Sequence, residues 1–266
     1  MSDPNCLLTT VEDGVAQLVL NRPDAMNTMT PDFLEEVLST LEAVANDDAI
    51  RVLIVTGAGR AFCAGGDLKR GPGGAVAGDG PLASQTRRLR TYMRTSQLLR
   101  DMPKITISAI NGACAGAGFS WACATDLRYA AKHARFATAF RNAALSGDFG
   151  GTWLLPRIVG AGRARELYLR SQPIDAAQAL EIGLISGIEE AENLLPVVIG
   201  IARDLAAAAP LALPLIKRNL NDADEIGFAE ALDREAARHS AMVATKDGTE
   251  AALAFTEKRK PNWSAT

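Results

Sequence analysis

The sequence is poor in the residues that build metal and disulfide sites. It contains four cysteines, none of them in a CxxC pair, and two histidines, His133 and His239. Four cysteines in a chain of 266 residues do not make a disulfide scaffold, so a reducing cytoplasm is favoured as its location. No Cys/His cluster has the spacing of metal ligands, which argues against a metal site. Cys63 and Cys114 stand in apolar runs and are expected to act as small core residues.

Charge excess and long apolar runs are also missing. The formal net charge is −3 and the sequence pI is about 5.5, so nothing indicates a nucleic-acid partner. No apolar run reaches the roughly 18 residues of a membrane-spanning helix. The start, Met1-Ser2-Asp3-Pro4, lacks a basic region followed by an apolar stretch, so no secretory signal is expected. With 48% hydrophobic and 22% charged residues, the composition is that of a soluble globular protein with a full core.

The apolar pattern predicts alternating strands and helices over the first two-thirds of the chain, which is typical of the α/β class. Asp13-Gly14 predicts a hairpin turn, and Thr30 the N-cap of a helix over 31–45. A Gly-rich segment from Gly71 to Gly80 is expected to be mobile. Further strands are predicted at 52–56, 105–110, 126–131 and 134–139, and helices at 85–102, 116–123, 174–183, 190–208, 211–221, 227–243 and 248–260.

The most informative segment is the run of small residues from Asn111 to Ser120, between an apolar strand and an apolar helix. Such a turn lets the backbone approach a ligand, and the N–H groups that open the helix can hold a developing negative charge. Tight packing of the helix on the sheet is the alternative explanation. A second small turn, Ala64-Gly65-Gly66-Asp67, also follows a buried strand. Two such turns can supply two converging N–H groups, which a thioester enolate requires.

Further motifs follow one another along the chain. They are Leu20-Asn21-Arg22-Pro23, Ala61 to Leu68, Ile110-Asn111-Gly112, Gly150-Gly151-Thr152, Leu155-Pro156-Arg157, Ala179 to Ile185 and Phe255 to Arg259. Taken in order, these segments resemble the crotonase superfamily, the enoyl-CoA hydratase/isomerase family, over nearly the whole chain. The resemblance implies a spiral of ββα units over residues 1–200 and a helical trimerisation and CoA-capping region over 201–266. It also implies a homo-oligomer, either a trimer or a dimer of trimers.

The resemblance also implies roles for single residues. The N–H groups of Gly66 and Ala117 would form the oxyanion hole for an acyl-CoA thioester of the kind used in fatty acid metabolism. Coenzyme A enters as part of the substrate, and no tightly bound cofactor is implied. Asp67 and Lys258 have structural alternatives, a helix cap and a solvated charge at a helix end, and Asp126 is expected to be structural. The residues that would contact coenzyme A are Ala25, Met26, Ala64, Asp67, Leu68, Phe255 and Lys258, the last two often from a neighbouring subunit.

Departures from the family pattern decide the expected reaction. Family hydratases hold two glutamates over the substrate, and here these positions are Ser120 and Phe140. A hydroxyl without an adjacent base and a phenyl ring cannot transfer protons near neutral pH, so hydration by that mechanism is not supported. Asp148 remains, in a segment that resembles the single-aspartate isomerases of the family. We expect Asp148 to move a proton between carbons of an enoyl-CoA.

The surroundings of Asp148 are expected to be apolar. Trp121, Phe140, Phe149 and Trp153 are close to it in sequence, and with Ser120 they are predicted to shape the substrate pocket together with the Gly71–Gly80 segment. Desolvation among these side chains would raise the pKa of Asp148 towards neutrality. The alternative is that Asp148 caps the helix that starts near Gly150.

Other interpretations stay open. The alternatives are an enoyl-CoA hydratase, as the family label suggests, and a non-catalytic acyl-CoA binder. The isomerase interpretation loses its base if Asp148 does not face the space between the N–H groups of Gly66 and Ala117. Ser120 lies in Gly118-Phe119-Ser120-Trp121-Ala122, one residue from the G-x-S-x-G elbow of hydrolases, with His239 as the late histidine. A dinucleotide site is weaker, because Gly112 to Gly118 does not spell G-x-G-x-x-G.

Overall fold

The computed structural model of the chain describes residues 6–71 and 76–266. Its strands are β1 (Leu7–Glu12), β2 (Val15–Leu20), β3 (Val52–Gly57), β4 (Ala61–Cys63), β5 (Ile105–Ile110), β6 (Ala113–Ala115), β7 (Leu127–Ala131), β8 (Arg135–Ala137), β9 (Ile174–Asp175) and β10 (Gly187–Glu189). Its α-helices are α1 (Pro31–Asn46), α2 (Leu82–Tyr92), α3 (Arg94–Asp101), α4 (Ala117–Ala124), α5 (Gly151–Val159), α6 (Ala161–Arg170), α7 (Ala176–Glu181), α8 (Ala191–Ala206), α9 (Ala212–Ala223), α10 (Phe228–Val243) and α11 (Lys246–Glu257). Short 3₁₀ helices are η1 (Pro23–Ala25), η2 (Leu68–Arg70) and η4 (Phe140–Ala143).

Within the described residues, the strands form two sheets. The larger sheet has the order β1-β2-β3-β5-β7-β10, with β1 antiparallel to β2 and every later pair parallel. The smaller sheet has the order β4-β6-β8-β9 and is parallel up to β8. Parallel neighbours need long connections between them, and the helices provide these connections.

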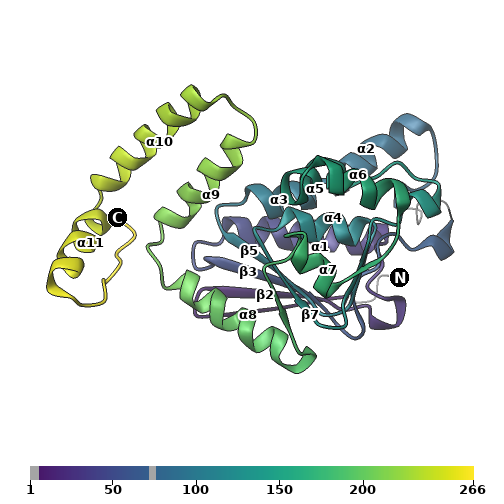
Figure 1. Cartoon of the computed structure of the whole chain (residues 1–266), viewed down its shortest axis with the longest axis horizontal. Helices are drawn as coiled ribbons and strands as arrows, with labels where there is room; N and C mark the ends of the chain where they lie inside the picture. Colours follow the sequence, from purple (N-terminus) through teal and green to yellow (C-terminus); the bar gives the residue numbers. More distant parts are fainter. Residues whose placement is uncertain (1–5, 72–75) are drawn as a thin grey trace.

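Helices cover both faces of the larger sheet. Figure 1 shows α4, α5 and α6 on one side of it and α8 on the other. Side chains of β3 alternate between these two cores: Leu53 belongs to the cluster that includes Leu34 of α1, and Ile54 belongs to the cluster that includes Val198 and Ala202 of α8. Burial on both faces explains why β3 reads as a continuous apolar run.

The structure confirms most of the predicted elements and corrects some. Asp13 and Gly14 form the hairpin turn with φ of 50° and 77°, and Thr30 caps α1 by accepting the Phe33 N–H at 3.4 Å. The single helix predicted over 85–102 is wrong, because α2 and α3 meet at Met93. Near this break the Thr95 hydroxyl donates to the Tyr92 carbonyl and so competes with the helix ladder. The short strands β4, β6, β9 and β10 were not predicted.

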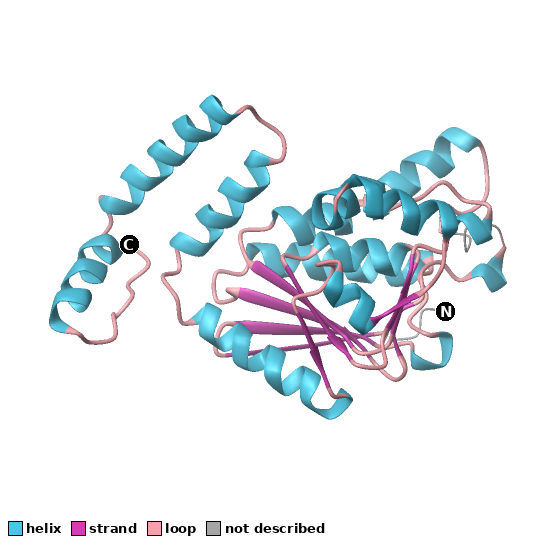
Figure 2. Ribbon diagram, viewed as in Figure 1, coloured by secondary structure: helices cyan, strands magenta, loops and turns pink. Residues whose placement is uncertain are grey.

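After α8 the chain leaves the sheet as an arm formed by α9, α10 and α11, which extends to one side in Figures 1 and 2. Residue 200 lies inside α8, whose contact with the sheet continues to Ala206, so the arm begins after α8. Lys217 of α9 ties the arm to the core. Its Nζ lies 2.8 Å from a carboxylate oxygen of Asp126 and donates to the carbonyls of Leu99 and Lys104. The structural role expected for Asp126 is thereby confirmed.

The four cysteines are free and buried. Cys63 and Cys114 are fully buried, as expected for small core residues. Burial raises the pKa of Cys63 and Cys123 to about 12, so both remain unreactive thiols near neutral pH. Over residues 6–71 and 76–266, no helix is long and apolar enough to cross a membrane, and no group of His, Cys, Asp and Glu side chains is arranged to hold a metal ion.

Candidate active site

The two turns of small residues lie against each other. A Cβ placed on Gly65 would stand 3.3 Å from the amide nitrogen of Ala117 and 3.5 Å from the Cα of Gly116. Gly65 and Gly116 have φ of +88° and +54°, which side chains rarely allow. The fold therefore brings two segments that are about fifty residues apart to one point, and glycine permits both the turn and the approach.

The backbone hydrogen bonds on either side of Gly66 leave the N–H of Gly66 itself without an acceptor. The Met29 N–H donates to the Gly65 carbonyl at 2.8 Å, and the Asp67 N–H donates to the Met29 carbonyl at 3.2 Å. Within the described part of the chain, the N–H groups of Gly66 and Ala117 have no hydrogen-bond acceptor. Ala117 is the first residue of α4, where N–H groups lack intrahelical acceptors. Two free donors on adjoining turns can stabilise an oxyanion.

Other glycines of the same run serve packing. A Cβ on Gly118 would stand 2.3 Å from the Cys63 carbonyl oxygen, and one on Gly112 would stand 2.2 Å from the Arg60 carbonyl oxygen. Both neighbours are backbone atoms, so neither position has room for a side chain. Tight packing is therefore the right explanation at Gly112 and Gly118, whereas the turn that precedes α4 keeps its free N–H group.

Asp148 lies in the loop before α5 and does not cap that helix. The N-cap of α5 is Gly150, which makes no side-chain capping bond, so the capping interpretation is wrong. Oδ1 of Asp148 is buried and has no hydrogen-bond partner among the described residues. Burial raises the pKa of this carboxyl from 3.8 to about 7. A carboxyl that titrates near neutrality can both accept and return a proton.

The Asp148 carboxyl also acts on the strand that leads into the Gly66 turn. Burial is the main cause of the raised pKa of Cys63, and the negative charge of Asp148 adds to it. The backbone of Gly65, two residues further on, opposes that rise. Cys63 therefore contacts the Gly65–Gly66 turn and also lies within electrostatic range of the carboxyl.

The two positions that hold glutamates in family hydratases are buried and carry no base. Ser120 is fully buried, and its Oγ lies 3.4 Å from the Gly116 carbonyl oxygen. Phe140 stacks on Tyr168 with ring centroids 6.0 Å apart and planes 10° apart. His239, the histidine of the hydrolase alternative, is exposed on α10 in the arm (Figure 1), and no hydrogen bond among the described residues pairs it with Ser120.

Trp121 belongs to the core around the site. Its ring packs on Phe33 at 6.4 Å and meets the edge of Phe149 at 5.9 Å, and its Nε1 donates to the Thr95 hydroxyl at 2.8 Å. Trp121 and Phe149 are almost completely buried. We interpret these two aromatic residues as the packed support of the Asp148 loop.

A cavity of about 450 Å³ opens beside that loop, between α3 and α5. Phe149, Gly150 and Trp153 line it from the Asp148 side, and Met93 lines it from the α2–α3 junction. Its largely apolar wall and its place next to Asp148 suit an acyl chain. The guanidinium group of Arg157 lies 3.6 Å from the centre of the Trp153 ring and holds this wall in place.

Five of the predicted CoA contacts lie along one stretch of the surface. The Ala64 N–H donates to the Met26 carbonyl at 3.1 Å, which joins the Ala25–Met26 turn to the Gly66 turn. Asp67 caps η2 by accepting the N–H two residues later at 3.3 Å, which confirms the cap expected for it. Leu68 follows and is 57% exposed.

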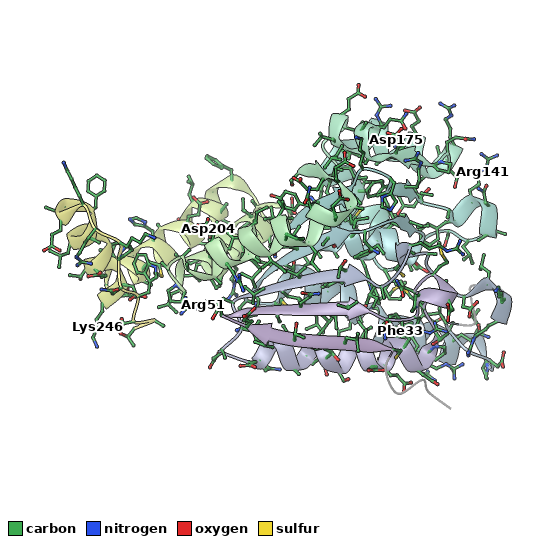
Figure 3. The ribbon with its side chains drawn as sticks, turned by 90° about the horizontal axis from the view of Figure 1, so that it is seen from below. Phe33, Arg51, Arg141, Asp175, Asp204 and Lys246 are labelled. Carbon is green, nitrogen blue, oxygen red and sulfur yellow. The ribbon has the colours of Figure 1, made fainter. Side chains whose placement is uncertain are left out.

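Phe255 and Lys258 lie elsewhere. Phe255 is 88% exposed on α11, and Lys258 ends that helix with φ of 54°. Figure 1 shows α11 at the far end of the arm, and in Figure 3 Lys246, at the start of α11, stands well apart from Phe33 in the core. Within one chain, the structure does not bring these two residues to the other candidates.

The Gly71–Gly80 segment is only partly covered, because residues 72–75 lie outside the described residues. Its mobility and its contribution to the pocket stay predictions. The part that follows is bound to α2, since the Arg88 guanidinium donates to the carbonyls of Ala77 and Asp79.

Tyr168 is a residue near Asp148 that sequence reasoning missed. Its hydroxyl is buried and interacts with the side chain of Ser120, and the charge of Asp148 acts on it. Tyr168 stands in α6 among charged residues, so the sequence around it does not indicate a position near the candidate site. The only available signal is its spacing of four residues from Ala164, which is buried on the same face of the helix.

Comparison with known proteins gives a consistent picture. The family model described as "Enoyl-CoA hydratase/isomerase" matches residues 10–266. The chain is 37% identical over 259 residues to 1,2-epoxyphenylacetyl-CoA isomerase of Escherichia coli K12, with 97% of this chain and 98% of that protein covered. It is 34% identical over 254 residues to crotonyl-CoA hydratase of Syntrophomonas wolfei, with 95% of each chain covered.

Solved structures agree with these relatives. The enoyl-CoA hydratase of Bacillus anthracis superposes with a TM-score of 0.91 at 31% identity, covering 98% of this chain and all of that one. A structure from Streptomyces coelicolor, described as a putative enoyl-CoA hydratase, gives a TM-score of 0.92 at 32% identity, covering 100% of this chain and 97% of that one.

Proposed function

Because the chain belongs to the enoyl-CoA hydratase/isomerase family, we propose that it is an isomerase that shifts a double bond in an enoyl-CoA. One observation carries the proposal. Oδ1 of Asp148 is buried without a partner among the described residues, the pKa of this carboxyl is raised to about 7, and its charge acts on Cys63, which leads into the turn that carries the free N–H of Gly66. The positions that serve water addition in the family hold Ser120 and Phe140 instead.

The proposed reaction needs one base and one oxyanion hole. The N–H groups of Gly66 and Ala117 polarise the thioester carbonyl, which makes protons on nearby carbons more acidic. Asp148 takes one of these protons, and the electron pair of the broken C–H bond moves into a dienolate whose charge rests on the thioester oxygen. The same carboxyl then returns the proton to another carbon of the chain. The double bond has moved, and no water or redox partner is consumed.

The rest of the site would bind the substrate. The acyl chain would run past Asp148 into the cavity lined by Phe149 and Trp153. The coenzyme A arm would lie along the surface that links Met26 to Ala64. Phe255 and Lys258 would reach the nucleotide of a neighbouring chain, which requires the proposed trimer or dimer of trimers.

The relatives carry both isomerase and hydratase names, so the choice between these reactions depends on the residues of this chain. A buried serine and a stacked phenylalanine argue against activation of water. A non-catalytic binder would gain nothing from a desolvated carboxylate, which destabilises the folded state when it is charged. The burial of Asp148 therefore favours an enzyme over a binder.

The test is incubation with panels of 2-enoyl-CoA and 3-enoyl-CoA in deuterated water, followed by NMR of the products. We expect double-bond migration with deuterium at the carbons that exchange protons. Asp148→Asn should lower kcat by about 10²- to 10⁴-fold, the usual contribution of a general base.

The matched control is Asp204→Asn, which changes an exposed carboxyl on α8 in the same way and should keep wild-type kcat. Robust addition of water that survives Asp148→Asn would overturn the proposed mechanism. If Asp204→Asn lost activity too, the loss in Asp148→Asn would not identify Asp148 as the catalytic base.

A further inference from the structure

Trp153 stands between two cavities. The cavity beside the Asp148 loop has a volume of about 450 Å³, and a second cavity of about 400 Å³ lies between the core and α9 of the arm. Arg100, Trp153 and Leu154 line both of them. Leu154 is buried and Trp153 is partly buried. These three residues therefore form a wall that the two cavities share.

Two guanidinium groups lie over the indole ring of this wall. The guanidinium carbon of Arg157 is 3.6 Å from the ring centre, and that of Arg100 is 4.7 Å from it. Arg157 also donates to the Trp153 carbonyl at 2.9 Å. Contacts of this kind are attractive, and they strengthen where water is excluded. The side chain of Arg100 is only 16% exposed, so the ring is held firmly in the wall.

The arm holds both arginines in place. Asp224, the C-cap of α9, lies 3.3 Å from a guanidinium nitrogen of Arg100 and 3.9 Å from one of Arg157. Arg100 also donates to the Asn221 carbonyl at 3.2 Å, and the Asn221 amide donates to the Arg100 carbonyl at 3.0 Å. One carboxylate of the arm therefore bridges the two cations that contact the Trp153 ring.

The second cavity has the character of a continued acyl pocket. Much of its lining is apolar and comes from Ile105, Leu127, Ile158, Leu205 and Leu213. Its lining also includes Asp126 and Lys217, which pair with each other at 2.8 Å. A hydrocarbon chain has no hydrogen bonds to satisfy, so it is suited to such a space.

We propose that Trp153 is a specificity-determining residue that ends the acyl cavity and limits the length of the acyl chain. Asp224 is a positioning residue, which holds the indole through Arg100 and Arg157. The inference rests on the proposed function, since that function places the acyl chain in the cavity beside Asp148. Removal of the indole joins the two cavities and admits a longer hydrocarbon chain.

The test measures binding by calorimetry with saturated, straight-chain thioesters from butyryl-CoA to tetradecanoyl-CoA. In the wild-type protein, we expect affinity to rise about fourfold for each methylene that is buried, and to stop rising once the chain reaches Trp153. In Trp153→Ala the rise should continue to longer chains. Relative to butyryl-CoA, tetradecanoyl-CoA should then bind at least about tenfold more tightly than it does to the wild-type protein.

The matched control is Trp263→Ala, which removes the same side chain from the C-terminal segment, where its Nε1 donates to the Ala207 carbonyl. This variant should keep the wild-type length limit. Circular dichroism checks that Trp153→Ala is folded, and Trp153→Leu is the second variant if it is not.

Asp224→Asn tests the positioning role without opening the wall. Binding of the longer chains should improve by up to about fivefold, the effect of one partly exposed ion pair, because Glu225 still pairs with Arg100 at 3.2 Å. Asp204→Asn should keep the wild-type profile. An unchanged length limit in Asp224→Asn would overturn the positioning role of this carboxylate.

Affinity that keeps rising to the longest ligand in the wild-type protein would overturn the proposal. So would the same length limit in the wild-type protein and a folded Trp153 variant, and the second cavity would then be left to a neighbouring chain. The ligands contain no double bond, so the result is independent of isomerisation. Failure of the enoyl-CoA assay would leave the length limit measurable, and failure of the length limit would leave that assay intact.

Discussion

Asp148 joins two properties that normally oppose each other, burial and charge. Its pKa is raised to about 7 because burial removes much of the water around it and Oδ1 has no partner among the described residues. In the unfolded chain the same carboxyl has its ordinary pKa near 3.8. The folded state therefore binds this proton more tightly, and the residue costs stability wherever it must ionise. Such a cost is typical of a functional site.

The sign of this effect gives a stability prediction. As pH rises from about 4 to about 7, folding loses stability, because the unfolded carboxyl has already released its proton while the folded one still holds it. Each pKa unit corresponds to about 1.4 kcal/mol. Asp148→Asn should therefore raise the melting temperature at pH 8, and the gain should shrink towards pH 4.

Thermal unfolding at a series of pH values measures this difference. Asp204→Asn, whose carboxyl is exposed, should show no comparable gain at any pH. An Asp148→Asn variant that is less stable than the wild-type protein at pH 8 would contradict the buried, unpartnered state of this carboxyl.

The same titration predicts the pH dependence of activity. The base form of Asp148 is the carboxylate, so kcat/KM should fall as pH drops below about 7, with a slope of one proton. Initial rates between about pH 5 and pH 9 test it. An acid limb near the ordinary carboxyl pKa of 3.8 would assign the base role to a solvated group.

At the scale of elements, the decisive feature is the junction of β6 with α4. Gly116 adopts φ of 54° and ψ of −125°, and its N–H is anchored on the Ala137 carbonyl at 3.0 Å. This conformation directs the next N–H, that of Ala117, away from the helix interior. Beside it, Gly118 lets α4 approach β4 closely. Position and direction of one oxyanion donor are therefore set by two glycines with different tasks.

Gly116→Ala should misplace that donor. A side chain at this φ is strained, so the turn must shift, and we expect kcat to fall by at least about tenfold, less than the 10²- to 10³-fold of a donor removed outright. Gly160→Ala is the matched control, since Gly160 also precedes a helix with positive φ, at 81°, and has open space around it. A similar loss of kcat in both variants would mean that backbone strain, and not a misplaced oxyanion donor, explains the effect.

At the scale of the molecule, the solved relatives confirm the expected fold, an α/β core followed by helices. The arm exposes a row of apolar side chains that a lone chain leaves in water. Phe228 is 80% exposed, Leu220 is 68% exposed and Leu232 is 48% exposed. Apolar surface of this kind marks an interaction face.

We expect sedimentation to give the mass of a trimer or of a dimer of trimers. Phe228→Glu combined with Leu232→Glu should shift the protein to smaller species, because charges would be buried in the interface. Leu82→Glu, at an apolar residue that is 78% exposed on α2 outside the arm, should leave the mass unchanged. A wild-type protein that sediments as a monomer would remove the route by which Phe255 and Lys258 reach coenzyme A.

Local patterns explain which expectations succeeded. Thr30 before Pro31 marked a helix start, and Asp13-Gly14 marked a hairpin, because each signal acts through neighbouring residues. The break at Met93 went unpredicted, because the competing bond of Thr95 leaves no trace in the apolar pattern. The short strands β4, β6, β9 and β10 were missed because two or three residues cannot show a period.

The sequence by itself determined the family, the order of strands and helices, and the absence of both hydratase glutamates, since these depend on residue types and on contacts close along the chain. Only the tertiary structure decided that the Gly65–Gly66 turn meets Gly116–Ala117, that Asp148 is desolvated without a partner, and that Tyr168 joins Ser120 under Gly151. Burial and the convergence of distant segments arise when helices and sheets pack, and no local pattern encodes either of them.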